Sequence, residues 1–301
     1  MSAYTDSALE RLPAPQIIDT PAFEPLFGQT RAAILEAMPE LATVLMLESE
    51  TATKMVRVFA YLRMLDRIEF NDRARGNLPA LATGADLDHM AARWGVFRLV
   101  RDPGNPDALP PVPATLENDT DLRRRMQLAL EGFSTAGPRG AYEFHALTAD
   151  GRVRDVAVTS PVPGQVVITV LSTEDDGIPS QEVLDLVEAA TSDDDVRPLN
   201  DTVVPQPAEL VDVTIVAELT LYDGPATEVV LAAAEAALAD HLDDHRKLGH
   251  DITTSGIIAA LYRQGVHRVD LTSPAADVVI SPTQAPRFPD PHTITIGGRD
   301  V

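Results

Sequence analysis

Three of the seven histidines lie close together in the sequence, at positions 241, 245 and 250. The first two are four residues apart, which on a helix places both imidazoles on one face, where such a pair can bind zinc. The stretch HLDDH lacks the glutamate that follows the first histidine in zinc peptidases. Gly249 is expected to end the helix before His250. We predict no metal and no cofactor, and keep a metal-dependent hydrolase using His241 and His245 as an alternative.

The stretch EGFSTAGPRGAYEFHALTAD, residues 131–150, also combines groups that could do chemistry. Ser134 and His145 could be the nucleophile and base of a hydrolase, and the glycines could line a phosphate. Neither glycine-rich nucleotide motif occurs in the chain, and no G-x-S-x-G elbow surrounds a serine. We predict no catalytic residue. A glycine–proline pair instead ends one helix and starts the next, with Pro138 in the first turn of the second helix.

Carboxylates are abundant but lack the spacing of a calcium loop. Asp86 and Asp88 do not fit the EF-hand pattern, and we expect Asp86 to be the N-cap of a helix that ends at Gly95. The stretches TEDDG and SDDDV lie between predicted elements, where solvated acidic loops are the simplest interpretation. We therefore predict an interaction protein and not an enzyme.

The distribution of charge argues against a nucleic-acid partner. The chain has 301 residues, no cysteine and a formal net charge of -22. Residues 151–250 hold 5 basic and 20 acidic side chains, whereas residues 1–150 hold 15 and 21. Phosphates would be repelled by the acidic region, so it faces solvent or a basic neighbour. No stretch approaches the roughly 18 apolar residues of a membrane span, and no signal peptide is evident at the start. We expect a protein kept in the cytoplasm unless it leaves inside a larger assembly.

The first third of the chain is predicted to be helical after an extended arm. Four prolines make residues 12–29 extended, a short helix follows over residues 30–38, and a long one covers residues 48–75. Apolar side chains cover much of the circumference of the long helix, so it lies either at the centre of its domain or between partners. We predict that it forms an interface through Met55, Val58, Phe59, Leu62, Arg63, Leu65 and Arg67.

Two sheet modules are predicted after residue 150. Residues 100–119 contain five prolines and are expected to be a linker, and residues 120–133 an amphipathic helix. Strands over residues 151–160 and 165–172, a helix over 181–191 and a strand over 196–204 form the first module. One long strand over 209–222, helices over 227–245 and 254–264, and strands from 266 and 292 form the second.

The predicted fold class is therefore α+β, with an N-terminal helical region followed by two small α+β modules in tandem. The expected domains are an arm and helical bundle region over residues 1–110, a linker with connecting helices over 111–150, and modules over 151–207 and 208–301, the last with an extended tail. Residues 131–150 join the helical region to the first module. If this joint bends, we expect Gly132, Gly137 and Gly140 to be its hinge.

Several long stretches, taken in order, resemble the baseplate J family of contractile-tailed bacteriophages. They are LPAPQIID, LESETATKMVRVFAYLRMLDRIEFND, GADLDHMAARWGVFR, EGFSTAGPRGAYEFHALTAD, VRDVAVTSPVPGQVVITVLS, VRPLNDTV and GHDITTSGIIAALYRQGVHRVDLTSP. The resemblance runs from about Leu12 to about Pro274, and the remaining residues match more loosely.

The resemblance implies a structural wedge subunit. Two copies would associate with one smaller tail protein, their N-terminal helices sharing a bundle, and the wedges would join into a ring around the central hub. The ring would contact hub and sheath-initiating proteins, and its rearrangement would trigger sheath contraction. It also implies assembly in the bacterial cytoplasm and a final location in the tail baseplate of a phage, tailocin or related particle. A freestanding cytoplasmic binding module is a further alternative.

Overall fold

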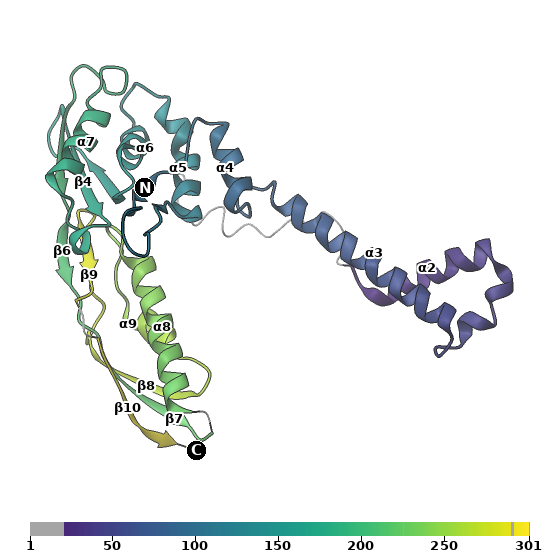
Figure 1. Cartoon of the computed structure of the whole chain (residues 1–301). Coiled ribbons are helices and arrows are strands. Elements are labelled where there is room, and N and C mark those ends of the chain that lie inside the picture. Colours follow the sequence, from purple (N-terminus) through teal and green to yellow (C-terminus); the bar gives the residue numbers. More distant parts are fainter. Residues whose placement is uncertain (1–20, 225, 290–291, 301) are drawn as a thin grey trace. The chain divides into compact units, whose positions relative to one another are not determined.

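The computed structural model describes residues 21–224, 226–289 and 292–300 (Figure 1). The first half of the segment predicted as extended, residues 12–20, lies outside the described residues. Contacts divide the described chain into two compact units. The first holds residues up to 97 together with residues 119–126, and the second holds residues 98–118 and those from 127 onward.

Helices make up the first unit. Its elements are α2 (Phe23–Ala37), the 3-10 turns η1 (Pro39–Leu41) and η2 (Val44–Met46), α3 (Thr51–Arg75) and α4 (Gly84–Ala92). The prediction that the chain stays extended to residue 29 is wrong, because α2 begins at Phe23. Pro25 is the third residue of this helix, where no intrahelical acceptor is available for a backbone N–H, so a proline is tolerated. The predicted long helix is confirmed as α3.

Small side chains of α3 pack it against α2. Thr53, Val56 and Ala60 are the buried residues of α3, and Leu26 is the buried residue of α2. The guanidinium of Arg57 lies over the rings of Phe23 and Phe27, at 5.9 and 5.4 Å from their centroids. Close packing of small residues and a cation–π contact therefore hold the two helices together.

The start of α4 differs from the prediction. Thr83 and not Asp86 is the N-cap, and the amide of Gly84 donates to Asp119 Oδ2 at 3.1 Å. A carboxylate from another helix thus satisfies one of the free amides at this helix start, so no local cap is needed. Gly95 adopts the left-handed conformation (φ 72°) expected of a glycine after a helix.

The second unit begins with two short paired strands, β1 (Val100–Asp102) and β2 (Thr115–Leu116), within the segment predicted as a linker. The helix α5 (Asp119–Gly132) spans the limit between the units and is followed by α6 (Arg139–Ala149). Pro138 is the N-cap of α6 and not a residue of its first turn.

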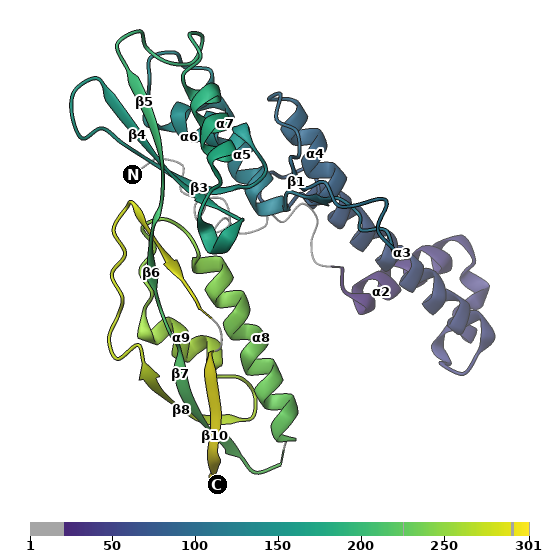
Figure 2. The ribbon, with the colours of Figure 1, turned by 60° about the vertical axis from the view of Figure 1, so that its left-hand side comes forward.

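A three-stranded sheet with two helices forms what we call the central module (Figure 2). The strands β3 (Val153–Thr159) and β4 (Gln165–Ser172) pair antiparallel, and β5 (Thr202–Pro207) pairs parallel with β4. Between them lie η3 (Asp175–Gly177) and α7 (Gln181–Thr191). The last strand begins six residues later than the predicted start at residue 196. The buried side chains of this module, Ile168 and Val170 among them, form one apolar core with α6 and α7.

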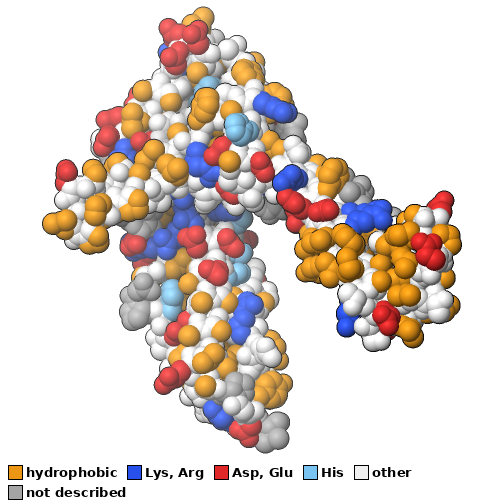
Figure 3. All heavy atoms as spheres, turned by 45° about the vertical axis from the view of Figure 1, so that its right-hand side comes forward, with side chains coloured by type: hydrophobic (Ala, Val, Ile, Leu, Met, Phe, Trp, Pro, Cys, Tyr) orange, Lys and Arg blue, Asp and Glu red, His pale blue; other side chains and the backbone are white. Residues whose placement is uncertain are grey.

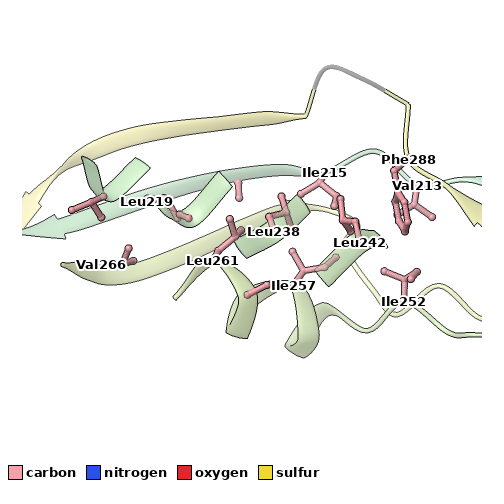
Figure 4. Packing of buried hydrophobic residues seen from close by; sticks show 14 of the residues in the cluster. Val213, Ile215, Leu219, Leu238, Leu242, Ile252, Ile257, Leu261, Val266 and Phe288 are labelled. Atoms are coloured by element: carbon pink, nitrogen blue, oxygen red, sulfur yellow. The ribbon is translucent and has the colours of Figure 1, made fainter. Parts of the chain in front are cut away.

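The C-terminal module has a second sheet, of order β10-β7-β8. It comprises β7 (Val216–Tyr222), α8 (Thr227–His245), α9 (Thr254–Leu261), β8 (Val266–Ser273) and β10 (Thr293–Asp300). Leu219, Leu238 and Leu261 meet in its core, beneath the two helices (Figure 4).

The predicted strand over residues 209–222 is in fact two. β6 (Glu209–Asp212) pairs with β9 (Gln284–Arg287), whereas β7 belongs to the three-stranded sheet. Val213 and Ile215, between the two strands, are buried. Apart from these boundaries, the predicted α+β class, a helical region followed by small sheet modules, is confirmed.

Candidate assembly surfaces

The long helix α3 carries large apolar side chains that the first unit leaves in contact with solvent. Eight of them are between 38% and 57% exposed. Six are Met55, Val58, Phe59, Leu62, Leu65 and Ile68, and the other two are Tyr61 and Phe70. Figure 3 shows hydrophobic side chains gathered over α2 and α3. Contiguous exposed apolar area of this kind is typical of interaction surfaces.

This apolar stripe lies opposite the side of α3 that packs against α2. Residues three, four and seven apart share a helix face, so Met55, Phe59 and Leu62 lie on one side, and Val56 and Ala60 on another. Arg63 and Arg67 follow Ala60 at three and seven residues, so they continue the side that faces α2. Of the predicted interface residues, the structure therefore brings the apolar five together and separates the two arginines from them.

The three predicted hinge glycines all lie at points of close packing. A Cβ on Gly132 would overlap the ring of Phe144, and one on Gly140 would come within 2.7 Å of Glu131 Oε2. Gly137 has a φ of 70° and approaches the ring of Pro198. These contacts explain the glycines at 132 and 137 without any bending, whereas the neighbour of Gly140 is a flexible side chain, and the hinge stays a prediction.

The aromatic residues after this joint have structural partners. Tyr142 is buried, and its hydroxyl donates to Asp201 Oδ2 at 2.8 Å. Burial, with the hydrogen bond to Asp201 next in importance, raises the pKa of Tyr142 well above its ordinary value. His145 Nε2 donates to the backbone oxygen of Gly132 at 3.1 Å, which ties α6 back to the end of α5. The segment is therefore a packed joint, as the sequence predicts.

The three clustered histidines do come together in space. The rings of His241 and His245 are 4.1 Å apart between centroids, and those of His245 and His250 are 6.2 Å apart. His245 Nδ1 donates to the backbone oxygen of His241 at 2.8 Å. Within the described part of the chain, no group of three histidines or carboxylates is arranged to hold a metal ion. Burial lowers the pKa of His241, and the charge of His245 lowers it further.

Several arginines of the second unit pair within the chain, whereas many of its acidic side chains face solvent. Arg152 contacts three carboxylates, the closest being Asp150 at 2.8 Å. Arg197 donates to the backbone oxygens of Ser192 and Asp201. The run Asp193–Asp195 is exposed beside it. The acidity of residues 151–250 is thus a surface property, and the chemistry it offers is attraction of a basic neighbour.

None of the helices within residues 21–224, 226–289 and 292–300 combines the length and the apolar character that crossing a bilayer requires.

Comparisons with known proteins agree on one family. Models of three baseplate J-like domains match the chain: the N-terminal domain at residues 48–105, the central domain at 134–207 and the C-terminal domain at 213–296. Baseplate protein J of Escherichia phage P2 is 41% identical over 297 residues, which cover 97% of this chain and 98% of that protein.

A solved structure is also similar, though weakly. A chain in the cryo-EM structure of the anti-feeding prophage (AFP) baseplate, 6-fold symmetrised, aligns with a TM-score of 0.43 and 14% identity. The alignment covers 60% of this chain and 44% of that one, a similarity from which no structural conclusion follows.

Members of the matched family are structural components of phage baseplates and not enzymes, so the hydrolase alternative that used His241 and His245 is wrong. The resemblance noted in the sequence is confirmed over the length of the chain, and the chain belongs to the baseplate J family.

Proposed function

We propose that this protein is a wedge subunit of a contractile-tail baseplate. Two copies associate with one copy of a smaller tail protein, and the wedges form a ring around the hub that transmits the trigger for sheath contraction. The protein is assembled in the bacterial cytoplasm and ends in the tail of the particle. Its membership of the baseplate J family supports this role, as does a surface suited to a shared helical bundle.

One observation carries the proposal: the apolar stripe on α3 is bare although the opposite side of the same helix is covered. Val56 and Ala60 are already buried within the first unit, and the hydroxyl of Thr53 donates to the backbone oxygen of Val44 in η2. The stripe beyond them carries the bulkier side chains, which include Met55, Phe59 and Leu62. Completing the burial of each contributes on the order of 1 kcal/mol, so the stripe stabilises an intermolecular bundle by several kcal/mol.

The occupant that fits this stripe is another α3 helix, from a second copy, together with a helix of the smaller protein. A stripe that runs along a helix of 25 residues is matched by another long amphipathic helix. Of the two arginines in the predicted interface, Arg63 is exposed and Arg67 half-buried, so Arg63 is the better placed to reach acidic side chains at the rim of such a bundle.

The test is co-expression with the smaller tail protein of the same particle, followed by mass measurement of the purified complex. The wild-type chain should give the mass of two copies plus one partner. A variant with Phe59→Asp and Leu62→Asp should run as a single chain, because each aspartate would place a charge inside the bundle.

Val229→Asp is the matched control, because Val229 on α8 is 69% exposed and lies outside the stripe. This variant should assemble as the wild type does. A complex of unchanged mass from the Phe59/Leu62 variant would refute the bundle, and a wild-type chain that stays single in the presence of the partner would refute the wedge.

A further inference from the structure

The second unit contains two modules, each with a core of its own. The central module packs Ile168 and Val170 of β4 against α6 and α7, and the C-terminal module packs Leu219 of β7 against α8 and α9. Each module therefore has its own source of hydrophobic stabilisation. Whatever holds one module against the other is a separate set of contacts.

The apolar part of that junction is small. Among the described residues, one cluster joins the two modules: the buried Leu171 of β4, Ala208 and Ala285 of β9, with Leu210 and Leu248 packed against them. Two of the three are alanines, so little apolar area is withdrawn from water. Hydrophobic contact alone is therefore a weak determinant of how the two modules are oriented.

Arg154 of β3 supplies the polar part of the junction. Its Nη2 donates to the backbone oxygen and to the carboxylate of Asp243, at 2.7 and 2.8 Å. Its Nε donates to the backbone oxygen of Arg246 at 3.0 Å. These acceptors lie at the C-terminal end of α8, where the helix dipole favours a cation. The backbone oxygen of Asp243 also accepts the amide of Arg246, at 3.2 Å.

Asp155, the next residue, binds the segment that follows α8. Its Oδ2 accepts a hydrogen bond from the amide of Leu248 at 2.9 Å, and its Oδ1 accepts one from the amide of Val156 at the same distance. Only 5% of Asp155 is exposed. A buried carboxylate that accepts backbone amides forms strong, directional hydrogen bonds.

An irregularity in β3 explains how two successive residues reach the same neighbour. Side chains of adjacent residues in a regular strand point to opposite faces of the sheet. The register of β3 against β4 shifts between Val153 and Asp155, the mark of a β-bulge. A bulge redirects a side chain locally, and here it allows both Arg154 and Asp155 to contact the end of α8.

We propose that Arg154 and Asp155 form a releasable latch that sets the orientation of the C-terminal module on the central module. Its contacts are polar and few, so breaking them exposes little apolar surface and leaves both cores intact. The chain crosses between the modules at Ala208, between β5 and β6, and this crossing is the pivot once the latch opens. Figure 2 shows β5 leading into β6 and the end of α8 close to β3. The latch does not depend on the wedge role, because it is a property of the single chain.

The test uses the full chain with two spin labels. Since the chain has no cysteine, Glu188→Cys on α7 and Ala236→Cys on α8 provide two exposed labelling sites, one on each module. Pulsed dipolar spectroscopy should give one narrow distance distribution in the otherwise unchanged chain. Adding Arg154→Ala and Asp155→Asn should broaden it at least about twofold. Arg268→Ala is the control, since Arg268 pairs with Asp270 on the exposed strand β8.

Hydrogen exchange provides the second measurement. In the latch variant, the Leu248 amide should exchange at least about 10-fold faster, because it loses a charged acceptor. Amides of Ile168 and Leu219, in the two cores, should keep their protection. Arg154→Lys, which retains the charge but not the forked donor, should give a smaller change at Leu248.

The outcomes separate clearly. A distance distribution as narrow as that of the control would overturn the latch, as would an unchanged Leu248 amide. A third outcome is loss of protection at Ile168 or Leu219 in both the latch variant and Arg154→Lys. It would mean that Arg154 and Asp155 keep a module folded and do not set its orientation, which also overturns the proposal.

Discussion

Replacement of Gly132 by alanine tests whether the joint between α5 and α6 is a packing contact or a hinge. A Cβ at Gly132 would overlap Cδ1 of Phe144 and lie 2.7 Å from Cε1 of the same ring. Phe144 is half-buried and packs against the core of the central module, so its ring has little room to move. Overpacking of this kind costs about 1–3 kcal/mol. Alanine stabilises a helix by roughly 0.5–1 kcal/mol relative to glycine, so we expect the free energy of unfolding to fall by about 1–2 kcal/mol in total.

Hydrogen exchange at Ile168 and Val170 measures this loss directly, because both amides belong to β4 in the core of the central module. Their exchange through opening of the module should quicken by a factor of roughly 5–30 in Gly132→Ala. Gly140→Ala is the matched control. Its Cβ would meet the flexible end of Glu131, which can turn away, so the change should stay within about 0.5 kcal/mol.

A second variant confirms the cause. Phe144→Leu removes the ring atoms that the new methyl would overlap, so the double variant with Gly132→Ala should lose less stability than the sum of the two single changes. Equal exchange in Gly132→Ala and the wild type would refute the steric argument. If such a variant also assembled normally but failed to trigger contraction, Gly132 would be a hinge and not a packing residue.

Three further changes have defined outcomes in urea unfolding. Tyr142→Phe removes the hydrogen bond to Asp201 and should cost about 1–2 kcal/mol. Because folding raises the pKa of Tyr142, the protonated hydroxyl contributes its full stabilisation below pH 10.0, the ordinary pKa of tyrosine, and this stabilisation is lost as pH rises beyond it. The free energy of unfolding of the variant should therefore lack this decline at alkaline pH. Folding lowers the pKa of His241, so the neutral imidazole stabilises the folded chain above pH 6.5, and this stabilisation is lost as pH falls. His241→Gln should therefore lose less stability towards acid pH than the wild type, and an equal loss in both would contradict this assignment. Arg152→Ala breaks the partly buried pair with Asp150 and should cost about 2 kcal/mol, with the difference from wild type fading at acid pH as the carboxyl protonates. A constant difference down to pH 2 would refute the last assignment.

Elements whose signal is local were predictable from the sequence. The helix predicted over residues 48–75 is observed over Thr51–Arg75, and the β-branched run at residues 165–172 is the strand β4 without any change of limits. The helix over Thr227–His245 likewise has the predicted bounds. In each case the periodicity spans the whole element, and little depends on what the element contacts.

Errors fell where a distant partner decides the local structure. Alternation over residues 209–222 indicates strand throughout, but it cannot reveal that Glu209–Asp212 pairs with one strand and Val216–Tyr222 with two others. The cap of α4 was missed for the same reason, because Asp119, 35 residues further along the chain, binds the Gly84 amide. The bulge in β3 does have a local signal, because the valines at 153, 156 and 158 break strict alternation.

The candidate surface shows the same division between local and distant information. Apolar residues around most of α3 predict that the helix is covered on more than one side, and within the first unit the structure buries the small residues Thr53, Val56 and Ala60. Side-chain size explains the choice, because small residues let two helices approach closely, whereas a short hairpin partner cannot bury Phe59 and Leu62 as well. Large apolar side chains left in water reduce solubility without stabilising the free chain. A partner that covers the stripe would explain why these side chains are retained on one side of the helix, and we therefore propose the bare side of α3, and not the clustered histidines, as the functional surface of this molecule.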